Sequence, residues 1–464
     1  MEADAVSERT LWVDVTTLVG WQGNPTGIVR TVSQMVPHLL ADDRVCVRLC
    51  RYDRWLGAYL RVEPSELAPA APPKPPGWTG RLVRLALVPW LAFVSVLPRS
   101  LREAAWHQAQ ALGWLVHLLR SVVYRATAWA VVPIRRAAAE RRYRTRWAGA
   151  MVPFAPGDVL FVAGAGWGDA TATDLCQRLR QEQSVRVVTL VYDITPIRQQ
   201  LYCRDDFCAA FTAWLPRLCA SADLILTISE HSRQDLRNYG REVGLAVPPV
   251  EVIRLGDEPG LGGEAAPAEL AAGQPFALFV SSILPHKNHR LLLQVWRRLL
   301  ERQGERTPTL VLAGGLGWRA EEVSAWLATD PRLHGRVVHL SHVDDRQLRW
   351  LYRHCLFTLY PSLYEGWGLP VAESLMYGKY CVSSNASSLP EVGGDLVDYH
   401  DPLDGVELLR LVERALFEPG LLTARETRIR NEYRITSWKE CAGQTLDLID
   451  RHSPVMRRAA AQAA

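Results

Sequence analysis

Several kinds of site that can be recognised from sequence are missing from this chain of 464 residues. It contains no Asp-x-Asp pair, and its nine cysteines form no C-x-x-C pair and have no histidines at zinc-finger spacing. We therefore expect no metal site, and reduced, mostly buried thiols of the kind found in a cytoplasmic protein. No G-x-G-x-x-G turn follows the first predicted strand, which argues against a dinucleotide-binding oxidoreductase.

Long apolar runs and a large excess of charge are also missing. No stretch reaches the ~18 uninterrupted apolar residues that a membrane-spanning helix needs. The first residues, MEADAVSERTLW, are acidic and polar, unlike a signal peptide, which again predicts a cytoplasmic protein. A net charge of +4 gives no case for binding nucleic acid. The hydrophobic content of 48% is normal for a globular protein, and the length predicts two domains of ~200 residues.

Short apolar runs alternate with helical periodicity in two blocks, a pattern that predicts two parallel sheets covered by helices. Between the blocks, residues 256–275 are rich in Gly, Pro and Ala, which indicates a linker. We therefore predict an α/β protein with two doubly wound domains, residues 1–255 and 276–435. Strands are predicted at residues 11–15, 45–49, 158–162, 185–191, 224–228 and 250–253 of the first block, and at 276–280, 309–313, 337–340, 357–360 and 380–383 of the second.

Residues 66–150 depart from this alternation. From residue 78 to residue 150 the segment contains twelve arginines and two glutamates, a net charge of +10 in a chain whose total is +4. Its apolar patches are too short to span a bilayer but suit helices that lie in the bilayer surface, where Trp and Arg act as anchors. Two interpretations stay open: peripheral contact with the cytoplasmic face of the inner membrane, or a helical insertion packed on the first domain.

The most informative segment is residues 360–391, YPSLYEGWGLPVAESLMYGKYCVSSNASSLPE. Glu365 and Glu373 lie eight positions apart around a Gly-rich turn, and we predict that a helix begins at Pro370, because proline is tolerated in a first helical turn. The N–H groups of such a strand-to-helix turn can bind an anion, and the carboxylates can accept hydrogen bonds from hydroxyls. The pattern therefore predicts a ligand that is half phosphate and half polyol, which describes a nucleotide sugar.

This segment resembles the E-x7-E signature of the retaining glycosyltransferases of family 4, also called group 1. These enzymes have the GT-B fold, in which two Rossmann-like domains face each other across a cleft. The resemblance implies transfer of a sugar from a nucleoside-diphosphate sugar to a glycan or lipid-linked glycan, with retention of anomeric configuration and without a metal or other cofactor. It also implies that a helix within residues 436–464 crosses back to the first domain.

The same resemblance implies roles for the residues of this turn. Glu373 should bind the ribose hydroxyls of the nucleotide, and Glu365 should lie near the donor sugar. The backbone amides that hold the sugar hydroxyls or the phosphate should be those of Gly366, Trp367, Gly368 and Leu369.

A second element, FVSSILPHKNH at residues 279–289, resembles the family's Gly-Arg-…-Arg-Lys-Asn element. Lys287 matches the lysine that neutralises the donor diphosphate. The earlier arginine position falls on Ser282, and His286 stands where arginine is usual; Arg254 or His286 could supply the missing charge. Gly314 begins another glycine-rich turn after a predicted strand. This strand with its turn is similar to the strand that precedes the nucleotide-base pocket in the family.

In the first block, GNPTGIVR at residues 23–30 resembles the loop that lines the interdomain cleft, so Asn24 and Thr26 should face the cleft. Gly27 should let the backbone come close to donor phosphate or acceptor. Further on, Ser229 is expected to be the N-cap of a helix that runs through Leu236.

Tyr192 and Asp193 form a second cleft element, at the end of a predicted strand. Many family members have a histidine beside the reacting sugar at the position of Tyr192, so the role of this tyrosine is open. Asp193 is either a polar catalytic group or a hydrogen-bonded residue that closes a turn.

Three functions follow from these observations. The first is a hexosyltransferase of surface polysaccharide synthesis, with GDP-mannose or a GDP-deoxyhexose preferred as donor and UDP-sugars close behind. The second is a sugar-nucleotide epimerase on the same fold. The third is a non-catalytic nucleotide-sugar-binding scaffold of a membrane assembly, which the departures at Ser282 and Tyr192 keep open.

Overall fold

The computed structural model describes residues 9–19, 21, 27–67, 145, 147–258, 262–271 and 273–452. Contacts divide the chain into two units, Met1–Glu66 with Val152–Ala464 and Leu67–Met151, and the first of these contains both sheets. The predicted insertion at residues 66–150, and with it the membrane contact through residues 78–150, lies almost wholly outside the described residues, as do Asn24 and Thr26. The domain boundaries stay predictions.

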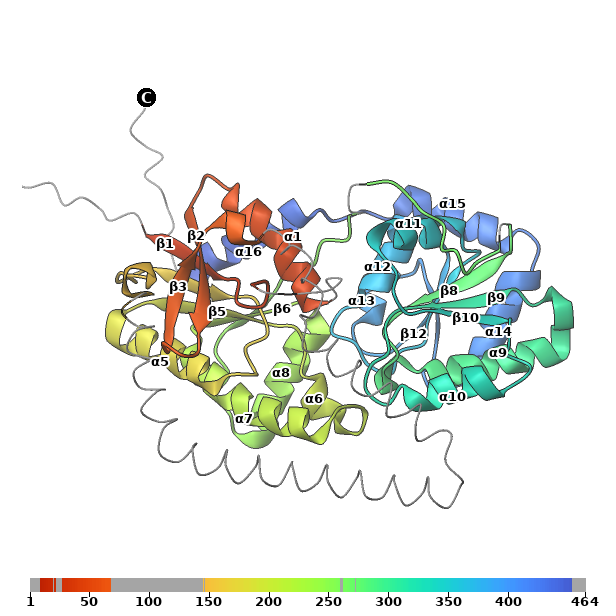
Figure 1. The fold of residues 1–464 in the computed structure, drawn as a ribbon, viewed down its shortest axis with the longest axis horizontal. Coiled ribbons are helices and arrows are strands. Elements are labelled where there is room, and N and C mark those ends of the chain that lie inside the picture. Colours follow the sequence, from red (N-terminus) through yellow and green to blue (C-terminus); the bar gives the residue numbers. More distant parts are fainter. Residues whose placement is uncertain are drawn as a thin grey trace, which may run out of the picture. The chain divides into compact units, whose positions relative to one another are not determined.

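The first sheet has seven strands in the order β3-β2-β1-β4-β5-β6-β7 (Figure 1). Neighbouring strands are parallel except for β3, which pairs antiparallel with β2. The prediction missed β3. It was based on the alternation of strands and helices, and an edge hairpin does not follow that alternation. The strands are β1 (Thr10–Asp14), β2 (Cys46–Asp53), β3 (Ala58–Val62), β4 (Val159–Val162), β5 (Arg186–Val191), β6 (Leu224–Thr227) and β7 (Val250–Val252).

The second sheet has six parallel strands in the order β10-β9-β8-β11-β12-β13. The bounds of β8, β9 and β10 are those that the sequence predicts. The prediction missed β13, a strand of three residues at the sheet edge, too short to show a periodicity. The strands are β8 (Phe276–Val280), β9 (Thr309–Ala313), β10 (Val337–Leu340), β11 (Thr358–Tyr360), β12 (Cys381–Ser384) and β13 (Asp398–His400).

We call β1–β7 with their helices the first lobe and β8–β13 with theirs the second lobe. The helices of the first lobe are α1 (Ile28–Leu40), α5 (Ala170–Gln183), α6 (Thr195–Arg198), α7 (Asp205–Ser221) and α8 (Glu230–Val243). Those of the second lobe are α9 (His289–Gln303), α10 (Glu321–Thr329), α11 (Asp345–His354), α12 (Leu369–Met376), α13 (Leu389–Gly393), α14 (Gly405–Phe417) and α15 (Leu421–Glu432), and α16 (Trp438–His452) follows. None of the described helices is long and apolar enough to cross a bilayer.

Two predicted helix starts are confirmed. Pro370 lies in the first turn of α12, where its missing N–H costs no intrahelical hydrogen bond. Ser229 caps α8: its hydroxyl oxygen accepts a hydrogen bond from the backbone N–H of Ser232 at 3.0 Å.

The helix α7 shows how the core of the first lobe forms. Its buried apolar residues recur at helical spacing, so that one face of the helix is apolar. That face packs against β5 and β6, where Val191 and Ile225 are also buried. The buried residues of this face are Phe211, Trp214, Leu215 and Leu218.

The C-terminal helix α16 lies beside α1 of the first lobe (Figure 1). The hydroxyl of Thr445 donates to the sulfur of Met35 at 3.7 Å, and Gln444 accepts the backbone N–H of Arg254 at 2.8 Å. Trp438 is fully buried, and a Cβ added to Gly256 would lie 2.6 Å from its ring. Helix α16 is therefore part of the first lobe's packing, although the whole second lobe precedes it in sequence.

Candidate functional site

Glu365 and Lys287 form a largely buried ion pair beyond the carboxyl ends of β8 and β11. Nζ of Lys287 lies 2.6 and 2.8 Å from the two carboxylate oxygens of Glu365. The hydroxyl of Tyr360 donates to the same carboxylate at 3.0 Å. Because β8 and β11 are neighbours in the sheet, residues 78 positions apart in sequence meet at one edge.

The surroundings of this pair keep the Glu365 carboxylate ionised. Burial raises the pKa of Glu365, but the charge of Lys287 and its hydrogen bonds outweigh burial, so that the pKa lies below its ordinary value. Burial also raises the pKa of Tyr360, which therefore keeps its proton and donates it. The cluster offers an ammonium and a carboxylate at the edge of the sheet, each already partnered.

The end of β5 in the first lobe meets the Glu365 turn at Gly366. A Cβ added to Gly366 would lie 2.7 Å from a carboxylate oxygen of Asp193 and 2.9 Å from the carbonyl oxygen of Tyr192, so this approach requires glycine. Burial raises the pKa of Asp193, Glu365 adds to the rise, and Lys287 opposes it. The three predicted catalytic residues, Glu365, Lys287 and Asp193, thus lie in one neighbourhood.

Tyr192 and Asp193 are also held by their own lobe. The hydroxyl of Tyr192 donates to the carbonyl oxygen of Ala163 at 2.9 Å, and its side chain is buried. Asp193 accepts the backbone N–H of Thr195 at 2.8 Å and so closes a turn. In this structure the side chain of Tyr192 points into the first lobe, and its carbonyl oxygen is the part that approaches the Glu365 turn.

Glu373 occupies a separate position on the buried face of α12. It forms an ion pair with Arg30 of α1, and it accepts a hydrogen bond from the hydroxyl of Tyr352 at 2.6 Å. Glu373 raises the pKa of Arg30, which stays charged. These three residues line a pocket together with Tyr377 and Trp438. A ribose that binds Glu373 must therefore share or replace the guanidinium of Arg30.

The turn between the two glutamates is fixed by close packing. Gly368 has a φ of +124° and precedes α12, and a Cβ there would lie 2.6 Å from the side chain of Leu389. The hydroxyl of Ser388 donates to the carbonyl oxygens of Trp367 at 2.8 Å and Glu365 at 3.0 Å. Trp367 is buried, and Leu369 begins the helix. The backbone of this turn is thus preorganised before any ligand arrives.

Ser282 and Gly314, two predicted donor-binding residues, lie together at the ends of β8 and β9. A Cβ added to Gly314 would lie 2.2 Å from the carbonyl oxygen of Ser281 and 2.8 Å from the nitrogen of Ser282, so that only glycine allows these loops to touch. Gly27 has a φ of +50° and precedes α1, three positions before Arg30.

Four residues that take part in these contacts were given no role by sequence reasoning. Arg30, Tyr360 and Glu391 stand inside the quoted strings, and Tyr352 stands outside them. Glu391 accepts the backbone N–H groups of Glu230 and His231 at 2.7 and 2.6 Å, at the start of α8. Arg30, Tyr352 and Glu391 contact residues in other segments of the chain, so their partners become visible only in the folded chain. Tyr360 contacts Glu365, five positions away, and also accepts a hydrogen bond from Nζ of Lys287 at 3.3 Å.

Among the residues that the structure describes, no three His, Cys, Asp or Glu side chains group as a site for a metal ion.

Comparisons with known proteins agree with this architecture. Residues 264–405 match the family model of the glycosyl transferases group 1, and residues 115–247 match that of the glucosyltransferase 3-like N-terminal domain. The O-antigen chain mannosyltransferase B of Escherichia coli is 30% identical over 266 residues, which are 56% of this chain and 69% of that protein.

Two further comparisons are more distant. The serotype-specific mannosyltransferase WbdA of Escherichia coli is 24% identical over 226 residues, 48% of this chain but only 28% of that longer protein. Among solved structures, the sucrose-phosphate synthase from Thermosynechococcus elongatus superposes with a TM-score of 0.57 and 15% identity, over 96% of this chain and 98% of that one. The structural likeness shows the fold, two Rossmann-like domains in the GT-B arrangement. The chain belongs to the family of the glycosyl transferases group 1, and it is a glycosyltransferase.

Proposed function

We propose that this glycosyltransferase transfers mannose from GDP-mannose to a growing surface polysaccharide, with retention of anomeric configuration. The observation that carries the proposal is the cluster of Lys287, Glu365 and Tyr360, which places a cation beside a carboxylate at the carboxyl edge of the second sheet. The choice of mannose is supported by the names of the relatives, an O-antigen chain mannosyltransferase and a serotype-specific mannosyltransferase.

In the proposed reaction Lys287 stabilises the charge of the leaving diphosphate. The bond between the anomeric carbon and the diphosphate oxygen breaks, and the acceptor oxygen forms its bond on the same face of the sugar. The acceptor proton passes to the leaving phosphate oxygen, so that no protein nucleophile is needed. The N-terminus of α12 adds partial positive charge, and a preorganised cation and amides need little rearrangement during the reaction.

The carboxylates receive the hydroxyl groups of the donor. We assign binding of the donor sugar to Glu365 and binding of the ribose to Glu373. Before the diphosphate binds, Glu365 also holds the Lys287 side chain in place. The proposal needs no metal ion, because Lys287 and the helix end supply the positive charge. The cytoplasmic location and the peripheral membrane contact through residues 78–150 belong to the proposal on the evidence of the sequence alone.

A panel of nucleotide sugars tests the proposal with the full chain. GDP-mannose should raise the melting temperature more than GDP-fucose, UDP-glucose or UDP-N-acetylglucosamine, because a ligand that binds only the folded form stabilises it. With a mannose oligosaccharide as acceptor, NMR of the product should show an α-linked mannose. A β-linked product would contradict retention, and a larger shift with a UDP-sugar would contradict the donor.

A further inference from the structure

The residues assigned to the donor offer one side-chain cation, Lys287, and a nucleoside diphosphate carries more negative charge than one ammonium offsets. Ser282, at the end of the neighbouring strand, is uncharged. Burial and the charge of Lys287 lower the pKa of His286 to about 4, so this histidine is neutral at pH 7. Arg254 lies 3.7 Å from the buried carboxylate of Asp257, which already serves as its counter-charge. A second positive charge must therefore come from another residue.

Arg30 is a cation beside the carboxylate that we assign to the ribose. Its side chain is 27% exposed, and that of Glu373 is 5% exposed. Nη1 of Arg30 donates to one carboxylate oxygen of Glu373, and the hydroxyl of Tyr352 donates to the other at 2.6 Å. Among the described residues, Glu373 is the hydrogen-bond partner of this guanidinium, and its other N–H groups are available to a ligand. A ribose hydroxyl that reaches Glu373 meets the guanidinium there.

The position of Arg30 in its helix is unusual for a positive charge. It is the third residue of α1, which begins after Gly27, and the first turn of α1 contains no acidic residue. The N-terminus of a helix carries partial positive charge, so a cation in the first turn is unfavourable unless an anion lies close by. Glu373 is that anion in the present structure. A bound diphosphate would be a stronger one.

The place assigned to the diphosphate lies within reach of this guanidinium. Leu369 begins α12, whose N-terminus faces the phosphate, and Glu373 is four residues further along, a rise of ~6 Å. In a nucleotide the ribose and the diphosphate are joined through one carbon atom, so a ribose on Glu373 brings the phosphates close to Arg30. The planar guanidinium can donate two parallel hydrogen bonds to a phosphate, which a lysine cannot do.

We propose that Arg30 is a second diphosphate-binding cation of this enzyme. When the ribose hydroxyls bind Glu373, the guanidinium turns to the diphosphate and supplies positive charge from the first lobe beside the Lys287 charge of the second lobe. At no stage is the charge of Arg30 left without a counter-charge, because the diphosphate arrives together with the ribose. The proposal rests on the proposed function for the nucleotide-sugar donor, and it adds a residue that senses the phosphates separately from the ribose.

Isothermal calorimetry on the full chain tests the proposal, with each nucleoside diphosphate compared with its own nucleoside. The probes are GDP with guanosine, and UDP with uridine. Arg30→Met should weaken GDP binding about 10-fold, the loss expected for a hydrogen bond between charged groups. Guanosine should bind at least as tightly as to wild type, because its ribose no longer competes with the guanidinium for Glu373. Arg30→Lys, which keeps the charge, should recover part of the GDP affinity.

A second comparison removes the effect of leaving Glu373 buried without its partner. In the Glu373→Gln background the carboxylate charge is already absent, so the further change Arg30→Met leaves no unpaired charge. It should still weaken GDP binding about 10-fold relative to Glu373→Gln alone. A loss that disappears in this background would show that Arg30 acts only by holding Glu373, and would overturn the proposal. The matched control is Arg410→Met, which removes an exposed arginine of α14.

The proposal is also overturned if Arg30→Met changes the affinities for GDP and guanosine by the same factor, or if it binds GDP as tightly as Arg410→Met does. The identity of the donor is read separately, from which nucleoside diphosphate binds wild type more tightly. Tighter binding of UDP would refute the proposed donor, and the role of Arg30 would then be decided by the same comparison of UDP with uridine. Absence of binding of both nucleoside diphosphates to wild type would refute both proposals.

Discussion

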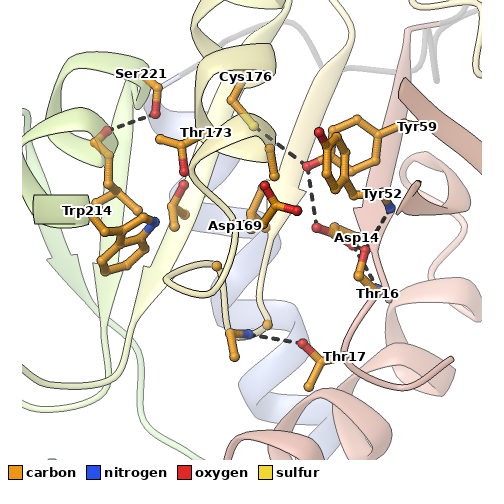
Figure 2. Close-up of a pocket in the computed structure, with 17 residues that line it drawn as sticks. Asp14, Thr16, Thr17, Tyr52, Tyr59, Asp169, Thr173, Cys176, Trp214 and Ser221 are labelled. Atoms are coloured by element: carbon orange, nitrogen blue, oxygen red, sulfur yellow. Dashed lines mark hydrogen bonds between the residues drawn. The ribbon is translucent and has the colours of Figure 1, made fainter. Parts of the chain in front are cut away.

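The Lys287 site of the second lobe and a pocket of the first lobe lined by Asp14, Asp169 and Trp214, here called the Trp214 pocket (Figure 2), lie at equivalent places. Each is found at the carboxyl ends of neighbouring parallel strands. They differ in charge. The second-lobe site contains Lys287 and the N-terminus of α12, which suit a diphosphate. The first-lobe pocket has Asp14, whose pKa burial raises, and Asp169, which is paired with Arg54 at the rim. The shared fold supplies the place, and the residues just after each strand decide which ligand it accepts.

The largest expected effect concerns the charged residues of the second-lobe site. Lys287→Met keeps most of the side-chain length but removes the ammonium, and Glu365→Gln removes the carboxylate charge. Each should lower kcat by ~100-fold or more, as for the loss of preorganised charge stabilisation. Transfer from GDP-mannose is the measurement, with the exposed Lys439→Met as the matched control. A variant of Lys287 or Glu365 with turnover near that of wild type would refute the assigned role.

A smaller effect is expected at the pocket between α1 and α12. Glu373→Gln should raise KM for GDP-mannose ~10-fold with little change in kcat, because a hydrogen bond between a charged group and the ribose is lost in ground and transition state alike. Glu391→Gln is the control for interlobe contact, since Glu391 also joins the lobes but lies outside this pocket. If both variants raise KM equally, the effect comes from the contact between lobes and not from ribose binding.

A third expected effect concerns the stability of the fold and not ligand binding. His289 is buried against Phe279 without a hydrogen bond in the described structure, and burial lowers its pKa to about 3. Between pH 6.5 and 3 the unfolded chain binds this proton and the folded chain does not, so stability falls as the pH falls. From pH 7 to pH 5 the loss amounts to about 2 kcal/mol.

His289→Leu removes this titration, so its melting temperature should fall less than that of wild type between pH 7 and pH 5. The exposed His334→Leu should behave like wild type. Equal falls for wild type and His289→Leu would show that this histidine is not held neutral by burial.

Much of the second lobe was predictable from sequence. The turn from Tyr360 to Glu373 combines glycines, a proline and a helix start within a few residues, so its local conformation follows from local chemistry. The two-sheet α/β architecture and the E-x7-E family were predicted for the same reason, since strand–helix alternation and the Glu365–Glu373 string are both readable along the chain.

What the sequence did not predict depends on contacts between distant segments. The ion pair of Arg30 with Glu373 joins residues 343 positions apart, and the Trp214 pocket gathers residues from β1, β4, α5 and α7. Trp214 itself reads as an ordinary buried residue of an apolar helix face, and nothing in its neighbours along the chain marks its nitrogen as unpartnered within the described structure. The edge strands β3 and β13 were not predicted, because β3 forms a hairpin with β2 and β13 is only three residues long.

The account of the second-lobe site is tested most directly by a structure of the full chain with GDP bound. We predict that the diphosphate lies within hydrogen-bonding distance of Nζ of Lys287, and that the ribose contacts Glu373. A diphosphate in the first-lobe pocket, or one that does not reach Lys287, would contradict this account.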